Sequence, residues 1–133
     1  MMEILRAGLL DLVMDLGRPG FRGQGVPEGG AADAMALVLA NRLVGNSDNA
    51  AALEILLRGP KIRFPAGARI ALTGAVMPMQ LDNKQLGPGR VVDVSPGGEV
   101  ELGVAENGLR AYLAVGGGIE ELVTRDQLRD QLH

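Results

Sequence analysis

Short apolar runs separated by glycine and proline recur along most of this 133-residue chain. Within several of these runs apolar and polar residues alternate, which is the period of a strand with one buried face. Glycine and proline between the runs supply the backbone conformations that tight turns need. We therefore expect a mostly β domain. The expected strands span residues 3–7, 9–14, 52–57, 61–64, 68–73, 76–81, 90–94, 99–104 and 109–115.

One segment has a helical period instead. Apolar side chains between residues 32 and 46 recur at spacings of three and four, which gives a wide apolar face. Asp33 is a suitable N-cap, and Gly45 with Asn46 is a suitable end for this main helix. The charged, glycine-free tail over 120–133 predicts a second helical segment.

Composition narrows the classes of function. The chain has two phenylalanines, one tyrosine, no tryptophan and a net charge of −3, so its core is aliphatic and nucleic acid is not an expected partner. Cysteine is absent and the one histidine is His133, so we expect no disulfide, no thiolate nucleophile and no metal site. No apolar run approaches the roughly 20 residues that cross a bilayer, and no signal peptide is visible. We therefore expect a cytoplasmic protein without a membrane partner.

The most constrained segment is the glycine-rich stretch over residues 15–33, "DLGRPGFRGQGVPEGGAAD", which leads directly into the expected helix. Glycines let backbone N–H groups approach a bound group closely, and a helix N-terminus favours an anion. Arg18 can grip a carboxylate through two hydrogen bonds, while Asp15 and Asp33 can act as acid or base or orient Arg18. The alternative is a tight connection held by a buried Arg–Asp pair, and the residues alone leave both interpretations open.

Two further polar residues have alternative interpretations. Asn41, near the end of the expected helix, can present its amide to a substrate carbonyl, but an asparagine at this place more often bonds loop backbone. Glu54 lies inside an apolar strand, where an inward side chain would resemble a catalytic acid. Alternation along the strand favours an outward Glu54 instead.

The stretches over 71–75 and 115–119 each end a strand in glycine, which fits either a cleft wall or a sharp turn.

Six motifs together resemble a known family. They are, in chain order, "DLGRPG", "GQGVPEGGAAD", "ANRLVGN", "ALEILLRGP", "ALTGA" and "RAYLAVGGGI". Their order and spacing are similar to those of the biotin-dependent carboxyltransferase family, which includes KipA, allophanate hydrolase subunit 2 and the C subunit of 5-oxoprolinase. The resemblance covers about residues 2–119 and implies a cyclophilin-like β-barrel over 1–119, with 120–133 as a non-family tail. Family members continue with a second half, so the chain looks like a truncated N-terminal half.

The resemblance also implies a function. It points to one component of a 5-oxoprolinase, allophanate hydrolase or carboxyltransferase system, acting on an amide- or urea-like carbonyl by ATP-dependent ring opening of 5-oxoproline or by carboxyl transfer. ATP or carboxybiotin would come through partner subunits, such as a KipI-like protein or one like the B subunit of 5-oxoprolinase, and not bind this chain directly. A homo-oligomer is a further expected form of assembly. The alternative is a KipA-like, non-catalytic module that binds an inhibitor of a sensor kinase.

The motifs give two sets of candidate site residues. The candidate catalytic residues are Asp15, Arg18 and Asp33. The candidate substrate-binding residues are Gly29, Gly30, Asn41, Asn46 and Glu54. One departure counts against full activity of this chain, because Met14 stands where the family usually has glutamine before the first aspartate and an amide donor is lost there.

Overall fold

The structure is a computed structural model that describes residues 2–17, 30–87, 91–119 and 122–124. The strands in this part of the chain are β1 (Met2–Arg6), β2 (Leu10–Met14), β3 (Ala52–Leu56), β4 (Lys61–Phe64), β5 (Ala68–Val76), β6 (Met79–Leu81), β7 (Lys84–Gln85), β8 (Val91–Val94), β9 (Gly98–Leu102), β10 (Asn107–Val115) and β11 (Leu122–Thr124). The helix is α1 (Ala34–Leu43). The mostly β expectation is confirmed, and each expected strand has a counterpart.

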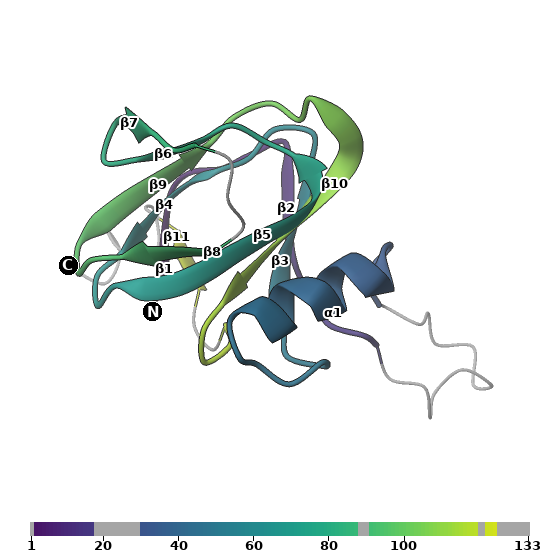
Figure 1. Ribbon diagram of the computed structural model, residues 1–133. Helices are drawn as coiled ribbons and strands as arrows, with labels where there is room; N and C mark the ends of the chain where they lie inside the picture. The colour runs from purple at the N-terminus through teal and green to yellow at the C-terminus, as the bar shows by residue number, and fades with distance from the viewer. Residues whose placement is uncertain (1, 18–29, 88–90, 120–121, 125–133) are drawn as a thin grey trace.

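The strands form two sheets that face each other (Figure 1). Sheet A has the order β11-β1-β4-β9-β6-β7, and sheet B has the order β2-β3-β10-β5-β8. Among the described residues all strand pairings are antiparallel except that of β1 with β11, which is parallel. No helix in the described part of the chain is long and apolar enough to cross a membrane.

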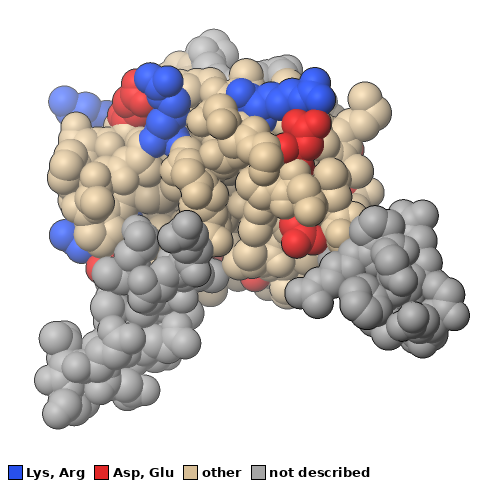
Figure 2. Space-filling model, turned by 90° about the horizontal axis from the view of Figure 1, so that it is seen from below, with Lys and Arg blue, Asp and Glu red and all other residues tan. Residues whose placement is uncertain are grey.

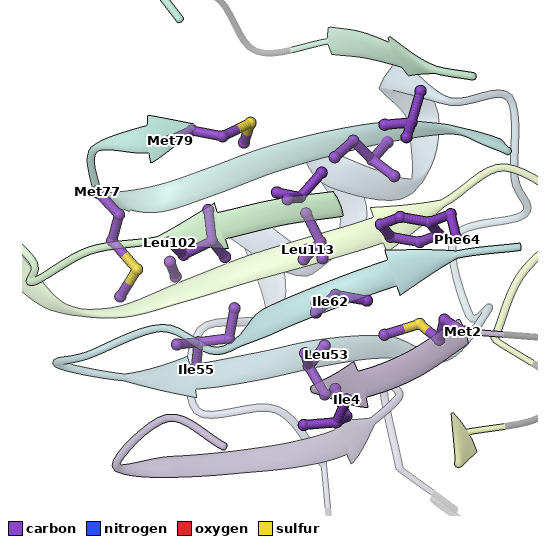
Figure 3. Close-up of a cluster of buried hydrophobic side chains, with 14 of the residues drawn as sticks. Met2, Ile4, Leu53, Ile55, Ile62, Phe64, Met77, Met79, Leu102 and Leu113 are labelled. Atoms are coloured by element: carbon purple, nitrogen blue, oxygen red, sulfur yellow. The ribbon is translucent and has the colours of Figure 1, made fainter. Parts of the chain in front are cut away.

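The main core fills the space between the two sheets, and Figure 3 shows its side chains. Leu53 and Leu113 enter it from sheet B, while Ile62, Phe64 and Leu102 enter from sheet A. All five side chains are buried. The core is aliphatic except for Phe64, as the composition predicts.

A second cluster lies on the outer face of sheet B, where α1 packs against β10, β5 and β3. Leu37 and Ala40 of α1 meet Tyr112 and the small residues Ala52 and Ala114, which allow the helix to approach closely. The ends of this helix agree with the sequence-based expectation. Its N-cap is Asp33, and the chain turns away through Gly45 at a φ of +80° that glycine adopts without strain.

The predicted barrel is not closed in the described residues. One isolated bridge, between Arg58 and Val104, links the chain beyond β3 in sheet B to the chain beyond β9 in sheet A. The strand breaks there because Leu57 has a φ of +60° and Pro60 has no N–H to donate. The chain therefore changes sheet through a turn instead of through a bent, continuous strand, and two facing sheets result.

Two other expectations need correction. The strand expected at 68–73 runs on to Val76, because Gly74 takes a φ of +80° and absorbs a register shift against β10 instead of ending the strand. Within the tail expected to be helical, Leu122–Thr124 form β11, since the open side of β1 offers a parallel partner. The rest of that tail, 120–121 and 125–133, lies outside the described residues.

Candidate functional site

The two ends of the glycine-rich stretch meet in a short neck, formed by residues 15–17 and 30–33. The N–H of Ala31 donates to the carbonyl of Asp15 at 2.9 Å, and the N–H of Gly17 donates to Asp15 Oδ1 at 2.8 Å. A Cβ on Gly30 would lie 2.9 Å from the carbonyl oxygen of Leu16, so only glycine fits there without movement. Asp15 and Gly30, both predicted site residues, are thus side by side.

Beneath the neck, a buried carboxylate and a buried phenol form a direct hydrogen bond. Tyr112 on β10 pairs in register with Glu54 on β3, and its hydroxyl donates to Glu54 Oε2 at 2.6 Å. The N–H of Ala32 donates to the same carboxylate oxygen at 3.0 Å, and the N–H of Asp33 donates to the Tyr112 hydroxyl at 2.8 Å. The last two amides before α1 are therefore satisfied by side chains of sheet B.

Glu54 turns away from the main core, as strand alternation predicts, but it is buried and is not an ordinary outward residue. Ala52 and Glu54 share the face of β3 that turns away from the main core, but that face is covered by α1 and by the neck. Strand alternation shows only which residues share a face, and both faces of β3 are buried. Tyr112 was not among the predicted site residues. The sequence could have indicated it, because a tyrosine inside an apolar strand needs a hydrogen-bond partner for its hydroxyl.

The environment of Tyr112 also fixes its protonation. Burial raises the pKa of Tyr112 to about 12, and the hydrogen bond to Glu54 acts in the same direction. The phenol therefore stays protonated at neutral pH and remains the donor toward Glu54. Arg110 approaches the other carboxylate oxygen of Glu54, with 3.8 Å between Nε and Oε1.

Asp33 links the neck to α1. Its side chain accepts a hydrogen bond from the N–H of Ala36 at 3.1 Å, which is the N-cap geometry expected from the sequence. The residue is exposed, so its carboxylate lies between solvent and the positive end of the helix dipole. Among the predicted site residues, Asp33 also borders the pocket described next.

A pocket of about 960 Å³ opens between α1, the distal half of β5 and the β6–β7 hairpin. Most of its wall is apolar, and its lining includes Met35 and Leu39 of α1 together with Met77 and Met79. Its polar lining residues are Asp33, Arg42, Thr73, Gln85 and Glu106. Figure 2 views the molecule from below and shows charged side chains at scattered points of a largely uncharged face. Residues 72–75 line this pocket, so most of the stretch 71–75 forms a cleft wall, which is one of the two interpretations that its sequence allowed.

Asn41 and Asn46 lie at the opposite end of α1 from Asp33. Asn41 is fully buried, and its Nδ2 donates to the carbonyl of Ala50 at 2.9 Å. Asn46 donates to the carbonyl of Val115 at 2.8 Å and accepts from the N–H of Gly117 at 2.8 Å. The favoured backbone interpretation of Asn41 is confirmed: its side chain holds the helix end to the loop before β3, and the side chain of Asn46 holds it to the end of β10. A substrate contact from either residue stays a prediction.

The structure thus brings Asp15, Gly30, Asp33 and Glu54 together and leaves the two asparagines apart. Arg18 and Gly29 lie outside the described residues. Three members of this group are carboxylic acids, and the N–H groups of Ala32, Asp33 and Ala36 already donate to side chains.

This chain is similar in sequence and in fold to known carboxyltransferase-family proteins. Residues 24–124 match the family model described as carboxyltransferase domain, subdomain A and B. The chain is 42% identical over 120 residues to the C subunit of 5-oxoprolinase from Escherichia coli K12, and 39% identical over 119 residues to urea amidolyase of Lachancea kluyveri. The crystal structure of the Kluyveromyces lactis urea carboxylase aligns with 88% of this chain at a TM-score of 0.83 and 37% identity.

The chain is much shorter than these relatives. It covers 39% of the bacterial 5-oxoprolinase protein, 6% of the Lachancea urea amidolyase and 10% of the aligned urea carboxylase chain. These matches span 90%, 89% and 88% of this chain, respectively. The similarity therefore concerns one segment of larger proteins.

Proposed function

The chain belongs to the carboxyltransferase domain family, and on that premise we propose that it acts with partner subunits on an amide- or urea-like carbonyl. Relatives named as the C subunit of 5-oxoprolinase and as urea amidolyase support a carboxyltransferase-family subunit. Of the possible reactions we favour ATP-dependent opening of the 5-oxoproline ring, because the chain covers 39% and 38% of two relatives with the 5-oxoprolinase name but only 6% of the Lachancea urea amidolyase. Carboxyl transfer to a urea-like substrate is the second reaction of the same proposal.

The neck carries this proposal. A hydrogen bond between Ala31 and Asp15 joins the two ends of the glycine-rich stretch, and Asp33 caps α1 directly after it. In our proposal Arg18 and loop amides hold the substrate carboxylate or polarise its carbonyl, while Asp15 or Asp33 moves a proton or orients Arg18. Glu54 and Tyr112 fix the neck from below through two backbone amides.

The energy source lies with the partners in this proposal. A KipI-like protein, or one like the B subunit of 5-oxoprolinase, would complete the site, and ATP or carboxybiotin would enter through that assembly. The chain would then supply substrate binding and charge stabilisation at the reacting carbonyl.

The test co-expresses this chain with a partner like the 5-oxoprolinase B subunit and measures ATP-dependent opening of 5-oxoproline. We expect Arg18→Ala to abolish substrate binding, because a charge-assisted bidentate contact is lost. Arg69→Ala is the matched control, since Arg69 is an exposed arginine paired with Asp93 away from the neck. Unchanged substrate affinity in Arg18→Ala would show that the site assignment is wrong.

The same experiment addresses the KipA-like alternative. A stable complex with the partner protein, without turnover in the presence or absence of nucleotide, would favour a regulatory module over an enzyme. Turnover that disappears in Arg18→Ala and persists in Arg69→Ala would favour the enzyme.

A further inference from the structure

The outer strand of sheet B has an apolar surface. In the described part of the chain β2 forms a ladder with β3 on one side, and its other side is an edge. Leu9, Leu10, Leu12 and Val13 are exposed by 61%, 47%, 40% and 45% of their surfaces. A strand edge with this composition readily pairs with another strand.

The other edge of sheet B, at β8, carries charge that discourages pairing with another strand, and β2 lacks such a charge. On β8, the exposed Asp93 is paired with Arg69, which places charge along that edge. At an edge of sheet A, β7 is only two residues long and includes the exposed Lys84. Short length and free charge are the usual means by which edges avoid pairing.

The one charged residue of β2, Asp11, does not protect this edge from pairing. Asp11 Oδ2 accepts a hydrogen bond from the N–H of Gly8 at 2.7 Å, so the side chain folds back along its own strand. Its Oδ1 is buried and has no hydrogen-bond partner among the described residues, and burial raises the pKa of Asp11. The edge of β2 therefore presents leucine and valine without an outward-pointing charge.

The backbone of β2 fits an antiparallel partner in one register. The N–H of Leu57 donates to Leu109 on the β10 side of β3, and backbone groups point to alternate sides of a strand. Glu54 therefore turns its backbone toward β2, where it pairs with Leu12. By the same alternation, Asp11 and Val13 turn their N–H and C=O groups to the open side.

We propose that the edge of β2 is an interface for a second copy of this chain, paired antiparallel about a two-fold axis at Leu12. In this register Asp11 of one copy faces Val13 of the other and both exchange backbone hydrogen bonds. Leu12 faces Leu12 of the other copy, and Leu10 faces Met14. No like charges lie opposite each other, so the strand is complementary to itself.

This interface joins sheet B of one copy and sheet B of the other into one continuous sheet. Leu12 pairs with Glu54, so the two necks lie on the same face of the joined sheet. The inference goes beyond the proposed function and does not depend on it, because it concerns assembly of the chain without substrate or partner subunits.

Sedimentation equilibrium of the purified full chain over a range of concentrations tests the proposal. We expect reversible doubling of the 13.9 kDa mass. Leu12→Lys and Leu12→Glu should each raise the dimer dissociation constant at least about tenfold, because two like charges meet at the axis. Mixing the two variants should restore a dimer, since lysine then faces glutamate. This rescue also shows that both variants are folded.

Two further variants separate edge pairing from general surface effects. Val13→Pro removes an N–H from the open side only and should also abolish the dimer while the pairing with β3 remains. Val91→Lys changes a similarly exposed valine, 42% accessible on the other edge of sheet B, and should leave the dimer intact. A monomer at all concentrations, a dimer that survives Leu12→Lys and Val13→Pro, or a failed rescue on mixing would each overturn the proposal.

Discussion

The hydroxyl of Tyr112 lies 2.6 Å from Oε2 of Glu54, and each group accepts a hydrogen bond from a backbone amide just before α1. Neighbouring strands of sheet B thus supply a side-chain platform for the neck. Because no backbone group among the described residues accepts from these two amides, the conformation of the neck depends on this pair.

Removal of the Tyr112 hydroxyl tests this dependence. We expect Tyr112→Phe to lower the free energy of unfolding by about 1–3 kcal/mol, because the Asp33 amide and the Glu54 carboxylate lose a buried partner. Urea unfolding measures the loss, and hydrogen exchange should show a faster Asp33 amide. Thr73→Val is the control, since its hydroxyl bonds the carbonyl of Ala36 and not the neck. Equal exchange at Asp33 in both variants would contradict the platform role.

The raised pKa of Tyr112 predicts a loss of stability at alkaline pH. The phenol ionises near 10 in an unfolded chain and near 12 in the folded protein, so the folded state retains the proton longer. Stability from this group is complete below pH 10 and falls by roughly 2–3 kcal/mol as the pH rises to 12. Unfolding measured between pH 9 and pH 12 checks this, and the slope assigned to Tyr112 should be missing in Tyr112→Phe.

Gly30 is expected to tolerate no side chain. In Gly30→Ala the new Cβ would meet the carbonyl of Leu16 at 2.9 Å, so the neck must open or shift. We expect a destabilisation of about 1–3 kcal/mol, as for other steric insertions into packed backbone. Gly87→Ala is the control, because a Cβ there meets open space. Thermal unfolding of the two variants should differ, and equal midpoints would show that the neck adapts freely.

Asn41 is expected to matter for stability more than an exposed asparagine would. In Asn41→Ala, the carbonyl of Ala50 and the side-chain amide of Asn46 each lose a hydrogen-bond partner. We expect the free energy of unfolding to fall by about 2–4 kcal/mol. Chemical denaturation provides the value. Asn49→Ala serves for comparison, because Asn49 accepts an exposed bond from the N–H of Leu16 and should cost less. A smaller loss for Asn41 than for Asn49 would contradict the structural role.

Much of the candidate site was visible in the sequence. The glycine-rich stretch, the N-cap Asp33 and the helix end at Gly45 follow from local rules about which residues adopt which backbone conformations. Six ordered motifs also indicated the family that the match over residues 24–124 shows. The cap and the helix end depend on neighbours within a few residues, so the chain alone specifies them.

Other features required contacts between distant segments. Alternation along β3 could not show that Glu54 is buried, because the neck that covers it comes from residues more than twenty positions earlier. The same holds for Tyr112, whose hydroxyl partners lie 58 and 79 positions away. The strand at Leu122–Thr124 formed where helical propensity was expected, since β1 offered an open edge to pair with.

The sequence by itself therefore determined the strands, the helix, its cap and the apolar character of the core. Only the tertiary structure decided that two sheets face each other without closing, that Glu54 is buried beneath the neck, and that the edge of β2 stays apolar and open to a partner in the described chain. The physical reason is that periodicity assigns each side chain to a face. What covers a face is set by packing between segments that lie far apart in the chain.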